Sequence, residues 1–158
     1  MEIEVNGAPT RAEIEPSRTL LEYLREEQLL RGTKLNCNDG DCGGCTVLLD
    51  GEPVNACLVL AVDADGHDVT TVEGLSADGE LHPVQRAFVE ESGLQCGFCT
   101  PGMMLSTLAL LRDVPEPSDA DIRLRLAGNM CRCTGYVKIF AAVRRAADLI
   151  AERAEVTR

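Results

Sequence analysis

Eight cysteines, arranged as two separate sets of four, constrain this 158-residue chain more than any other feature. The first set lies within residues 37–57 and the second within residues 96–133. The opening residues, MEIEVNGAPT, resemble neither a secretory signal nor a twin-arginine leader. In a reducing cytosol such cysteines more often bind metal or carry out redox chemistry than form disulfides. The sequence therefore predicts a cytoplasmic protein with two metal sites.

Composition and charge narrow the function classes. The chain is 45% hydrophobic with 3% aromatic residues, which indicates a folded protein with an aliphatic core. It contains no apolar run long enough for a transmembrane helix. The net charge of −11 argues against nucleic acid or an anionic membrane as a partner. Residues 1–74 hold 15 acidic and 5 basic residues, whereas residues 75–158 hold 11 and 10, which suggests two domains with different neighbours.

The first half shows signals typical of a small sheet with one helix. Asn6-Gly7 and Asp50-Gly51 are two-residue hairpin turns by composition. Thr19 followed by Glu22 fits a capping box at the start of a helix, whose apolar stripe would be Leu20, Leu21 and Leu24. The predicted strands cover residues 1–5, residues 10–15, both sides of Asp50-Gly51, and a short run within 67–75. These elements predict a mixed α+β sheet with a helix on one face.

The second half predicts four helices after a polar linker at residues 76–82. Helix starts are indicated at Pro83, at Thr100 as an N-cap followed by Pro101, at Ser118 with Asp121, and near Tyr136. The last helix would bury a stripe formed by Phe140, Val143, Ala147 and Ile150. Short connections between such helices are typical of a small bundle.

The first cysteine set has the spacing of plant-type [2Fe–2S] ligation, Cys37-x4-Cys42-x2-Cys45 followed by Cys57. The loop also carries Gly40, Gly43 and Gly44, which would let backbone N–H groups turn toward the sulfurs. Structural zinc favours two paired C-x2–4-C knuckles, whereas here three cysteines share one loop and the fourth falls on a predicted strand. Zinc and inert buried thiols stay open as alternatives.

The second set combines Cys96-x2-Cys99 in QCGFCTPGMM with Cys131-x-Cys133 in NMCRCTGY. Each half contains a Cys-Thr pair followed by a predicted helix, so each would place thiolates at a helix N-terminus, where an anion is stabilised. This pattern favours a four-thiolate iron–sulfur cluster, and zinc remains open here too. A thioredoxin-like thiol pair lacks the βαβ context that it needs.

Five other residues have simpler interpretations. Arg132 either adds positive charge beside the second set or is an exposed arginine. His67 and His82 lie in polar, turn-like stretches, so we expect them to be solvated rather than to bind metal. Met103 and Met104 are expected to fill the core.

Four segments together carry a family resemblance: GTKLNCNDGDCGGCTVLLDGEPVNACL, VTTVEGL, HPVQRAFVEESGLQCGFCTPGMM and LAGNMCRCTGYVKI. From residue 1 to about 150, the chain resembles the small [2Fe–2S] iron–sulfur subunit of the molybdenum hydroxylases, the xanthine dehydrogenase/aldehyde oxidoreductase family. The resemblance implies a β-grasp, plant-type ferredoxin-like domain over residues 1–75. It further implies a four-helix bundle domain over residues 83–158, with one [2Fe–2S] cluster in each domain.

The resemblance also implies a role and partners for each site. Cys96, Cys99, Cys131 and Cys133 would hold the cluster nearest the molybdenum–pterin cofactor of a large subunit. Cys37, Cys42, Cys45 and Cys57 would hold the distal cluster, nearer FAD in a medium subunit. Gln95 matches the glutamine that hydrogen-bonds the pterin, and Cys133 matches the ligand that approaches it.

No catalytic residue is expected in this chain, which would serve a molybdenum-dependent oxidoreductase by one-electron transfer within a dimer of heterotrimers. A free-standing ferredoxin-like carrier is the alternative function. One departure from the family is Asn36, where glycine is usual before the first cysteine. Asn tolerates the left-handed backbone region, so cluster binding is still expected. The polar loop residues Asn38, Asp39 and Asp41 would affect the distal potential or the flavoprotein contact.

Overall fold

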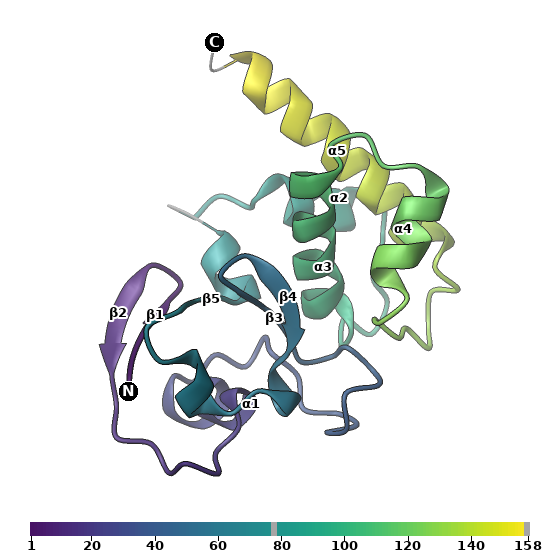
Figure 1. Cartoon of the computed structure of the whole chain (residues 1–158). Coiled ribbons are helices and arrows are strands. Elements are labelled where there is room, and N and C mark those ends of the chain that lie inside the picture. The colour runs from purple at the N-terminus through teal and green to yellow at the C-terminus, as the bar shows by residue number, and fades with distance from the viewer. Residues whose placement is uncertain (77–78, 157–158) are drawn as a thin grey trace.

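The computed structural model describes residues 1–76 and 79–156. It has a mixed α/β architecture, in which a sheet region is followed along the chain by a helical region (Figure 1). The last helix, drawn in yellow, extends beyond the other helices, away from the sheet. The predicted linker at 76–82 includes residues 77–78, and the predicted second domain includes residues 157–158; these four residues lie outside the described part of the chain.

The sheet has five strands in the order β2-β1-β5-β3-β4. The strands are β1 (Glu2–Val5), β2 (Ala8–Arg11), β3 (Thr46–Leu49), β4 (Glu52–Asn55) and β5 (Asp68–Thr70). β1 and β5 are parallel and lie at the centre of the sheet, while the other neighbouring pairs are antiparallel. Both predicted hairpin turns are confirmed. Each has two successive residues at positive φ: Asn6 (+53°), Gly7 (+77°), Asp50 (+49°) and Gly51 (+82°).

The predicted strand at residues 10–15 is wrong in its position, because β2 covers residues 8–11. The two-residue turn pairs Val5 with Ala8, so Glu2, the first residue of β1, pairs with Arg11. β2 ends there because β1 has no further residue to pair with it. The run at 67–75 is a strand only over β5, and a 3₁₀ turn, η4 (Val72–Leu75), follows it. The position expected for Cys57 also changes. It lies in a 3₁₀ turn, η2 (Ala56–Leu58), directly after β4 rather than on a strand.

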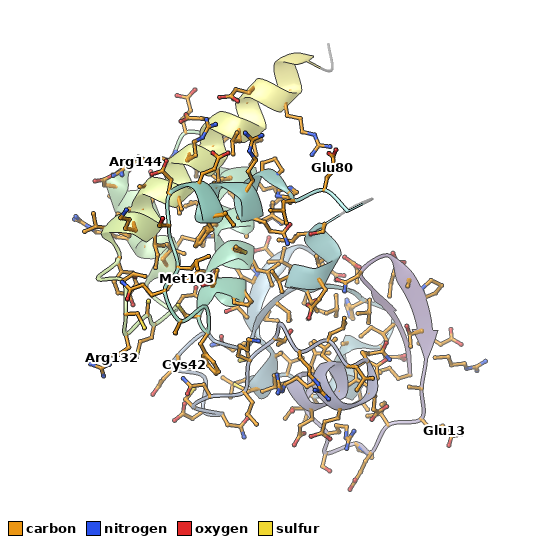
Figure 2. All side chains as sticks on the ribbon, turned by 180° about the vertical axis from the view of Figure 1, so that it is seen from behind. Glu13, Cys42, Glu80, Met103, Arg132 and Arg144 are labelled. Carbon is orange, nitrogen blue, oxygen red and sulfur yellow. The ribbon has the colours of Figure 1, made fainter. Side chains whose placement is uncertain are left out.

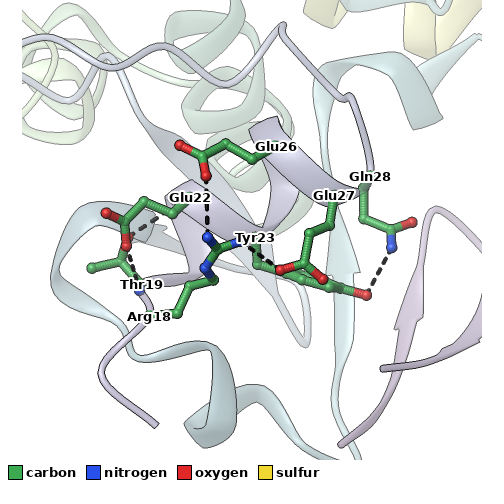
Figure 3. Close-up of polar contacts among 7 residues, drawn as sticks. All are labelled: Arg18, Thr19, Glu22, Tyr23, Glu26, Glu27 and Gln28. Atoms are coloured by element: carbon green, nitrogen blue, oxygen red, sulfur yellow. Dashed lines mark hydrogen bonds and ion pairs between the residues drawn. The ribbon is translucent and has the colours of Figure 1, made fainter. Parts of the chain in front are cut away.

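The helix beside the sheet begins as predicted. The Thr19 hydroxyl accepts a hydrogen bond from the Glu22 N–H at 3.2 Å, and the Glu22 carboxylate accepts one from the Thr19 N–H at 2.9 Å (Figure 3). One α-helical turn, α1 (Leu20–Glu22), continues into a π-helical turn, η1 (Tyr23–Glu27). The predicted stripe is buried, together with Tyr23. On the outer face, Arg18 pairs with Glu26 and Glu27 (Figure 3).

This helix packs against the sheet to form the first hydrophobic core. Apart from Tyr23 and two cysteines, its buried side chains are aliphatic, as expected from a composition poor in aromatic residues. Two cysteines of the first set, Cys45 and Cys57, belong to this core. The other main members are Ile3, Val5, Leu20, Leu21, Tyr23, Leu24, Val47 and Val69. The core therefore fixes one side of the first cysteine site.

The second region contains the four expected helices, namely α2 (Pro83–Glu90), α3 (Thr100–Asp113), α4 (Asp119–Leu126) and α5 (Val137–Val156). The Ser118–Asp121 capping box is confirmed. His82, which was expected to be solvated, caps α2 instead: its Nδ1 accepts from the Val84 N–H at 3.2 Å, and burial lowers its pKa. The N-cap of α3 is Cys99 and Thr100 lies inside the helix, so the helix begins one residue earlier than predicted.

The second core lies between these helices, and Met103 and Met104 are buried in it as predicted. The stripe predicted for α5 is rotated from the true one. Val143 is fully buried, but Phe140, Ala147 and Ile150 lie at the edge of the core. The buried face of α5 consists of Ile139, Ala142, Val143, Ala146 and Leu149. The buried face differs from the predicted one because α5 packs mainly against α2, and the side chains of α2 decide which positions of α5 are covered.

The two regions are packed against each other. Leu48 of β3 belongs to the core of the helical region. Arg112 of α3 donates to the Gly51 carbonyl at 2.7 Å and to the Glu52 carboxylate at 2.6 Å. A helix therefore holds the tip of the β3–β4 hairpin. At the other end of α3, Gly102 lies against the Gly43 backbone, which places the loop that precedes β3 beside the start of this helix.

Candidate iron–sulfur sites

The first site is the loop before β3 together with the turn after β4. Cys42, Cys45 and Cys57 are buried, and Cys37 is half-buried. The Cys42 N–H donates to Cys37 Sγ and the Gly44 N–H to Cys42 Sγ, each at 3.4 Å. The glycine-rich loop therefore points backbone donors at sulfur, as its sequence predicts.

The thiols of this site form two neighbouring pairs, Cys37 with Cys42 and Cys45 with Cys57. Burial raises the pKa of Cys45 to about 12, and the adjacent Cys57 thiol adds to the effect. At Cys42 burial also acts to raise the pKa, but hydrogen bonds from the loop outweigh it and leave the pKa below its ordinary value. A metal or cluster that bound these sulfurs would displace the Cys45 proton, because cysteine ligates metal as the thiolate.

The second site joins two loops of the helical region. Cys96 and Cys133 are exposed with their sulfurs 3.6 Å apart, and the half-buried Cys99 and Cys131 lie beside each other. Burial raises the pKa of Cys99 to about 12, with a further contribution from Cys131. The four cysteines that the sequence divides into C-x2-C and C-x-C are thus brought together. Each neighbouring pair takes one member from each motif.

The residues present fit a [2Fe–2S] cluster at both sites. Such a cluster takes four cysteine thiolates shared between two irons, and each site offers four cysteines as two pairs. The Thr100 hydroxyl, directly after Cys99 in the chain, is buried and has no hydrogen-bond partner among the residues that the structure describes. A buried hydroxyl with no partner is costly, so it favours a bound group that supplies an acceptor nearby. Within residues 1–76 and 79–156, no three His, Cys, Asp or Glu side chains are grouped to hold a single metal ion.

The segment between the two sites contains residues that the sequence did not single out. Asn129 is buried, with 5% of its surface exposed. Its Nδ2 donates to the Gly43 carbonyl at 3.0 Å and to Thr46 Oγ1 at 3.1 Å, while Ser106 Oγ donates to its Oδ1 at 2.7 Å. A polar residue directly before the Met-Cys-Arg-Cys motif is the only signal that the sequence gave. Its side chain connects the loop of the first site to the helical region.

Tyr136 is the second such residue. Its hydroxyl accepts from the Cys131 N–H at 2.8 Å and donates to the Asn129 carbonyl at 3.1 Å. The tyrosine therefore fixes the backbone on both sides of Met130. The sequence presented it only as the start of the last helix.

Arg132 and His67 take no part in either site, whereas Gln95 and Cys42 lie in or beside one. Arg132 is exposed and points away from the protein, which favours the simpler interpretation (Figure 2). His67 directly precedes β5, and its Nδ1 is 2.6 Å from the Asp50 carboxylate. Gln95 is exposed beside the exposed Cys96. Cys42 lies where the sheet and helical regions meet (Figure 2). No helix in the described ranges has the length and apolar character needed to cross a membrane.

A sheet region and a helical region, each carrying four cysteines, define a two-cluster iron–sulfur protein. Comparison with known families agrees: residues 3–72 match the "2Fe-2S iron-sulfur cluster binding domain" family, and residues 71–144 match the "[2Fe-2S] binding domain" family. Two [2Fe–2S] clusters are therefore the cofactors of this chain. This finding overrules zinc and inert thiols as interpretations of the cysteines.

Known proteins identify the family. The chain is 50% identical to a probable xanthine dehydrogenase subunit of Bacillus subtilis (strain 168), over 89% of this chain and 81% of that protein. It is 44% identical to the nicotinate dehydrogenase small FeS subunit of Eubacterium barkeri, over 92% and 93% of the two chains. The chain belongs to the small iron–sulfur subunits of the molybdenum hydroxylase (xanthine dehydrogenase/aldehyde oxidoreductase) family.

Solved structures agree with this membership. A chain of quinoline 2-oxidoreductase from Pseudomonas putida 86 superposes with a TM-score of 0.93 at 43% identity, covering 98% of this chain and 95% of that one. The aldehyde oxidoreductase from Desulfovibrio desulfuricans ATCC 27774 gives a TM-score of 0.92 at 40% identity. There the match covers 96% of this chain but 17% of the longer one. The same fold thus occurs as a short chain and as a part of a longer chain.

Proposed function

We propose that this chain passes electrons singly between a molybdenum–pterin site in a large subunit and FAD in a medium subunit. It uses two [2Fe–2S] clusters and performs no hydroxylation itself. In the proposed assignment, the distal cluster is ligated by the first cysteine set, Cys37, Cys42, Cys45 and Cys57. The cluster proximal to molybdenum is ligated by the second set, Cys96, Cys99, Cys131 and Cys133. When bound, the clusters supply one-electron redox chemistry. The chain supplies ligands, hydrogen bonds to sulfur and a fixed separation of the two sites.

One contact carries this proposal. The Met130 N–H donates to the Cys42 carbonyl at 2.9 Å, and Met130 is bonded directly to Cys131. A ligand of one site is thus joined to a ligand of the other through the peptide backbone and a single hydrogen bond. Asn129 and Tyr136 hold this contact from both sides. A short path of this kind supports transfer between the sites and would serve no purpose in two independent structural metal sites.

The exposure of the two sites supports the proposed orientation. Cys96 and Cys133 are exposed with Gln95 beside them, so this edge is open to a partner's cofactor. We place the pterin here, with Gln95 as its hydrogen-bond partner and Cys133 as the nearest ligand. At the distal site Cys37 is the least buried of the four cysteines, and it is flanked by the exposed Asn38 and Asp39. We place the flavin subunit against that loop.

The finer architecture belongs to the same proposal. Residues 1–75 would form a β-grasp, plant-type ferredoxin-like domain, residues 76–82 a linker, and residues 83–158 a four-helix bundle domain. The parallel β1–β5 pair at the centre of the sheet, with α1 packed against it, supports the β-grasp assignment. We further propose a cytoplasmic dimer of heterotrimers. Two of the relatives described above are named as subunits, which supports the multi-subunit character of this assembly.

A free-standing ferredoxin-like carrier is the competing function. The exposed apolar side chains near the second site argue against it. Phe98, Met130 and Val137 expose 43%, 56% and 78% of their surfaces, and all three lie in or next to the segments that carry the cysteines. Apolar side chains gathered around a functional site are typical of a surface that a partner covers. A lone carrier would leave them in water.

Affinity purification of the tagged chain from its native host tests the assembly. We expect two larger chains to co-purify, one with molybdenum and one with FAD. A stable lone monomer that supports full substrate turnover with a soluble acceptor would refute the heteromeric assignment.

Metal analysis tests the cofactors separately. We expect about four iron and four acid-labile sulfide per chain, and zinc without sulfide would reject both clusters.

A further inference from the structure

The hydroxyl of Thr134 is held against a cysteine sulfur of the second site. Thr134 Oγ1 donates to Cys131 Sγ at 3.1 Å. The same oxygen accepts a hydrogen bond from the Tyr136 N–H at 3.2 Å. Because the N–H approaches a lone pair of the oxygen, the hydroxyl proton is left to point at sulfur. The donor therefore has a defined direction.

The turn that positions this hydroxyl has an uncommon backbone conformation. Gly135 and Tyr136 both have positive φ, +61° and +68°. An aromatic residue seldom adopts this conformation, which persists only where its surroundings fix it. The Tyr136 hydroxyl provides that fixation through its bonds to the Cys131 N–H and the Asn129 carbonyl. The backbone of Tyr136 thus orients Thr134, and its side chain orients Cys131.

A hydroxyl hydrogen bond to a ligand sulfur has a predictable electrostatic effect. Reduction adds one negative charge to a cluster and its thiolates, and a hydrogen-bond donor stabilises the more negative state. Hydrogen bonds to the sulfurs are among the factors that set iron–sulfur reduction potentials. The Thr134 hydroxyl, which donates to Cys131 Sγ, therefore favours the reduced form of the second site.

We propose that Thr134 is a positioning residue that raises the reduction potential of the second site through its hydrogen bond to Cys131 Sγ. The inference rests on the proposed function, since it takes Cys131 as a cluster ligand. A higher potential at this site favours acceptance of an electron from the molybdenum side. Tyr136 acts with Thr134 by holding both donor and acceptor in place.

Redox titration of the intact complex, followed by electron paramagnetic resonance, tests the proposal. Thr134→Val removes the hydroxyl and keeps the branched shape of the side chain. We expect the second site to become harder to reduce, with its reduced-to-oxidised ratio at fixed potential falling about tenfold, which is 59 mV for one electron. Thr134→Ser keeps the hydroxyl and should retain most of the original potential. The first site should not shift and serves as an internal reference.

The matched control is Thr10→Val, the same chemical change on β2, where the hydroxyl donates to the Ala8 carbonyl at 3.4 Å. Neither potential should change in this variant. An unchanged second-site potential in Thr134→Val overturns the proposal. Equal shifts in Thr134→Val and Thr134→Ser also overturn it, because the hydroxyl would then not be the cause.

If Thr134→Val fails to retain its cluster, the unaltered complex still decides the question. After exchange into deuterated water, electron–nuclear double resonance should detect a deuteron coupled to the second site that Thr134→Ser retains. Absence of that deuteron refutes the hydrogen bond. Absence of any iron–sulfur signal from the unaltered complex would instead refute the proposed function, so the two failures are distinguishable.

Discussion

Replacing Asn129 by alanine should loosen the junction between the sheet and helical regions. The change removes three buried hydrogen bonds, to the Gly43 carbonyl, to Thr46 Oγ1 and from Ser106 Oγ. The Gly43 carbonyl keeps its bond from the Thr46 hydroxyl at 2.8 Å, whereas the buried Ser106 hydroxyl loses its acceptor. The two bonds whose partners stay bonded to each other cost about 1 kcal/mol net apiece, and the stranded Ser106 hydroxyl costs about 1–3 kcal/mol, so we expect the free energy of unfolding to fall by about 3–5 kcal/mol.

Urea denaturation of the cluster-loaded protein measures this loss, with circular dichroism and visible absorption as parallel probes. Ser106→Ala is the matched control, because it removes the donor that Asn129→Ala leaves stranded. In the double variant the two effects should not add, and the coupling energy should be about 0.5–3 kcal/mol. Asn129 also lies next to Met130, so the magnetic interaction between the two reduced clusters should weaken in Asn129→Ala.

Two results would refute this reasoning. One is a change in unfolding free energy within about 0.5 kcal/mol, the range of an ordinary surface substitution. The other is strict additivity of the Asn129 and Ser106 substitutions. Either would mean that the hydrogen bonds of Asn129 do not hold the two regions together.

Three further predictions address the sites and the sheet. Cys131→Ser should abolish the paramagnetic signal of the second site and leave that of the first; loss of both signals would show that the two regions do not fold independently. Gly43→Ala should destabilise the protein more than Gly7→Ala. Both glycines have positive φ, so alanine strains the backbone at either position. Of the two, only Gly43 lies so close to other atoms, the Gly128 carbonyl first, that an added methyl group would clash with them. The difference between the thermal unfolding temperatures of the two variants therefore reports the clash alone. The Asp50 pKa is lowered by the Asp68 N–H and then by His67. A carboxyl with a depressed folded-state pKa stabilises the protein above its unfolded pKa of about 3.9, and this contribution is lost as the pH falls through the folded-state pKa. The difference in urea midpoint between the unaltered protein and Asp50→Asn should thus be present at neutral pH and shrink in acid; a difference that stays the same in acid would contradict it.

Local signals in the sequence predicted the elements that depend on local chemistry. The Asn6-Gly7 and Asp50-Gly51 turns and the caps at Thr19 and Ser118 all form as expected, because each is decided by neighbouring residues. The extent of β2 was missed, since a strand ends where its partner ends and not where alternation stops. The buried face of α5 was also missed, because packing against α2 selects it.

The gathering of the cysteines into two sets could be predicted from their spacing, because metal-binding cysteines recur at short intervals in loops. Their neighbours could not be predicted in this way. Asn129 bonds to Gly43 and Thr46 across more than eighty positions in sequence, and no local pattern encodes such a contact. Thr134 was noted only as part of a Cys-Thr repeat, while its bond to Cys131 Sγ depends on the unusual backbone of Tyr136.

The close fit between the two regions limits how they can be exchanged or redesigned. Side chains added at Gly43 or Gly102 would collide with backbone of the facing region, and Asn129 fills the space between them. A chimera that took its sheet region from one relative and its helical region from another would have to keep these three positions as a set. Recombination between the sheet and helical regions would break this fit, so a directed-evolution library that recombines homologues should place its crossovers elsewhere.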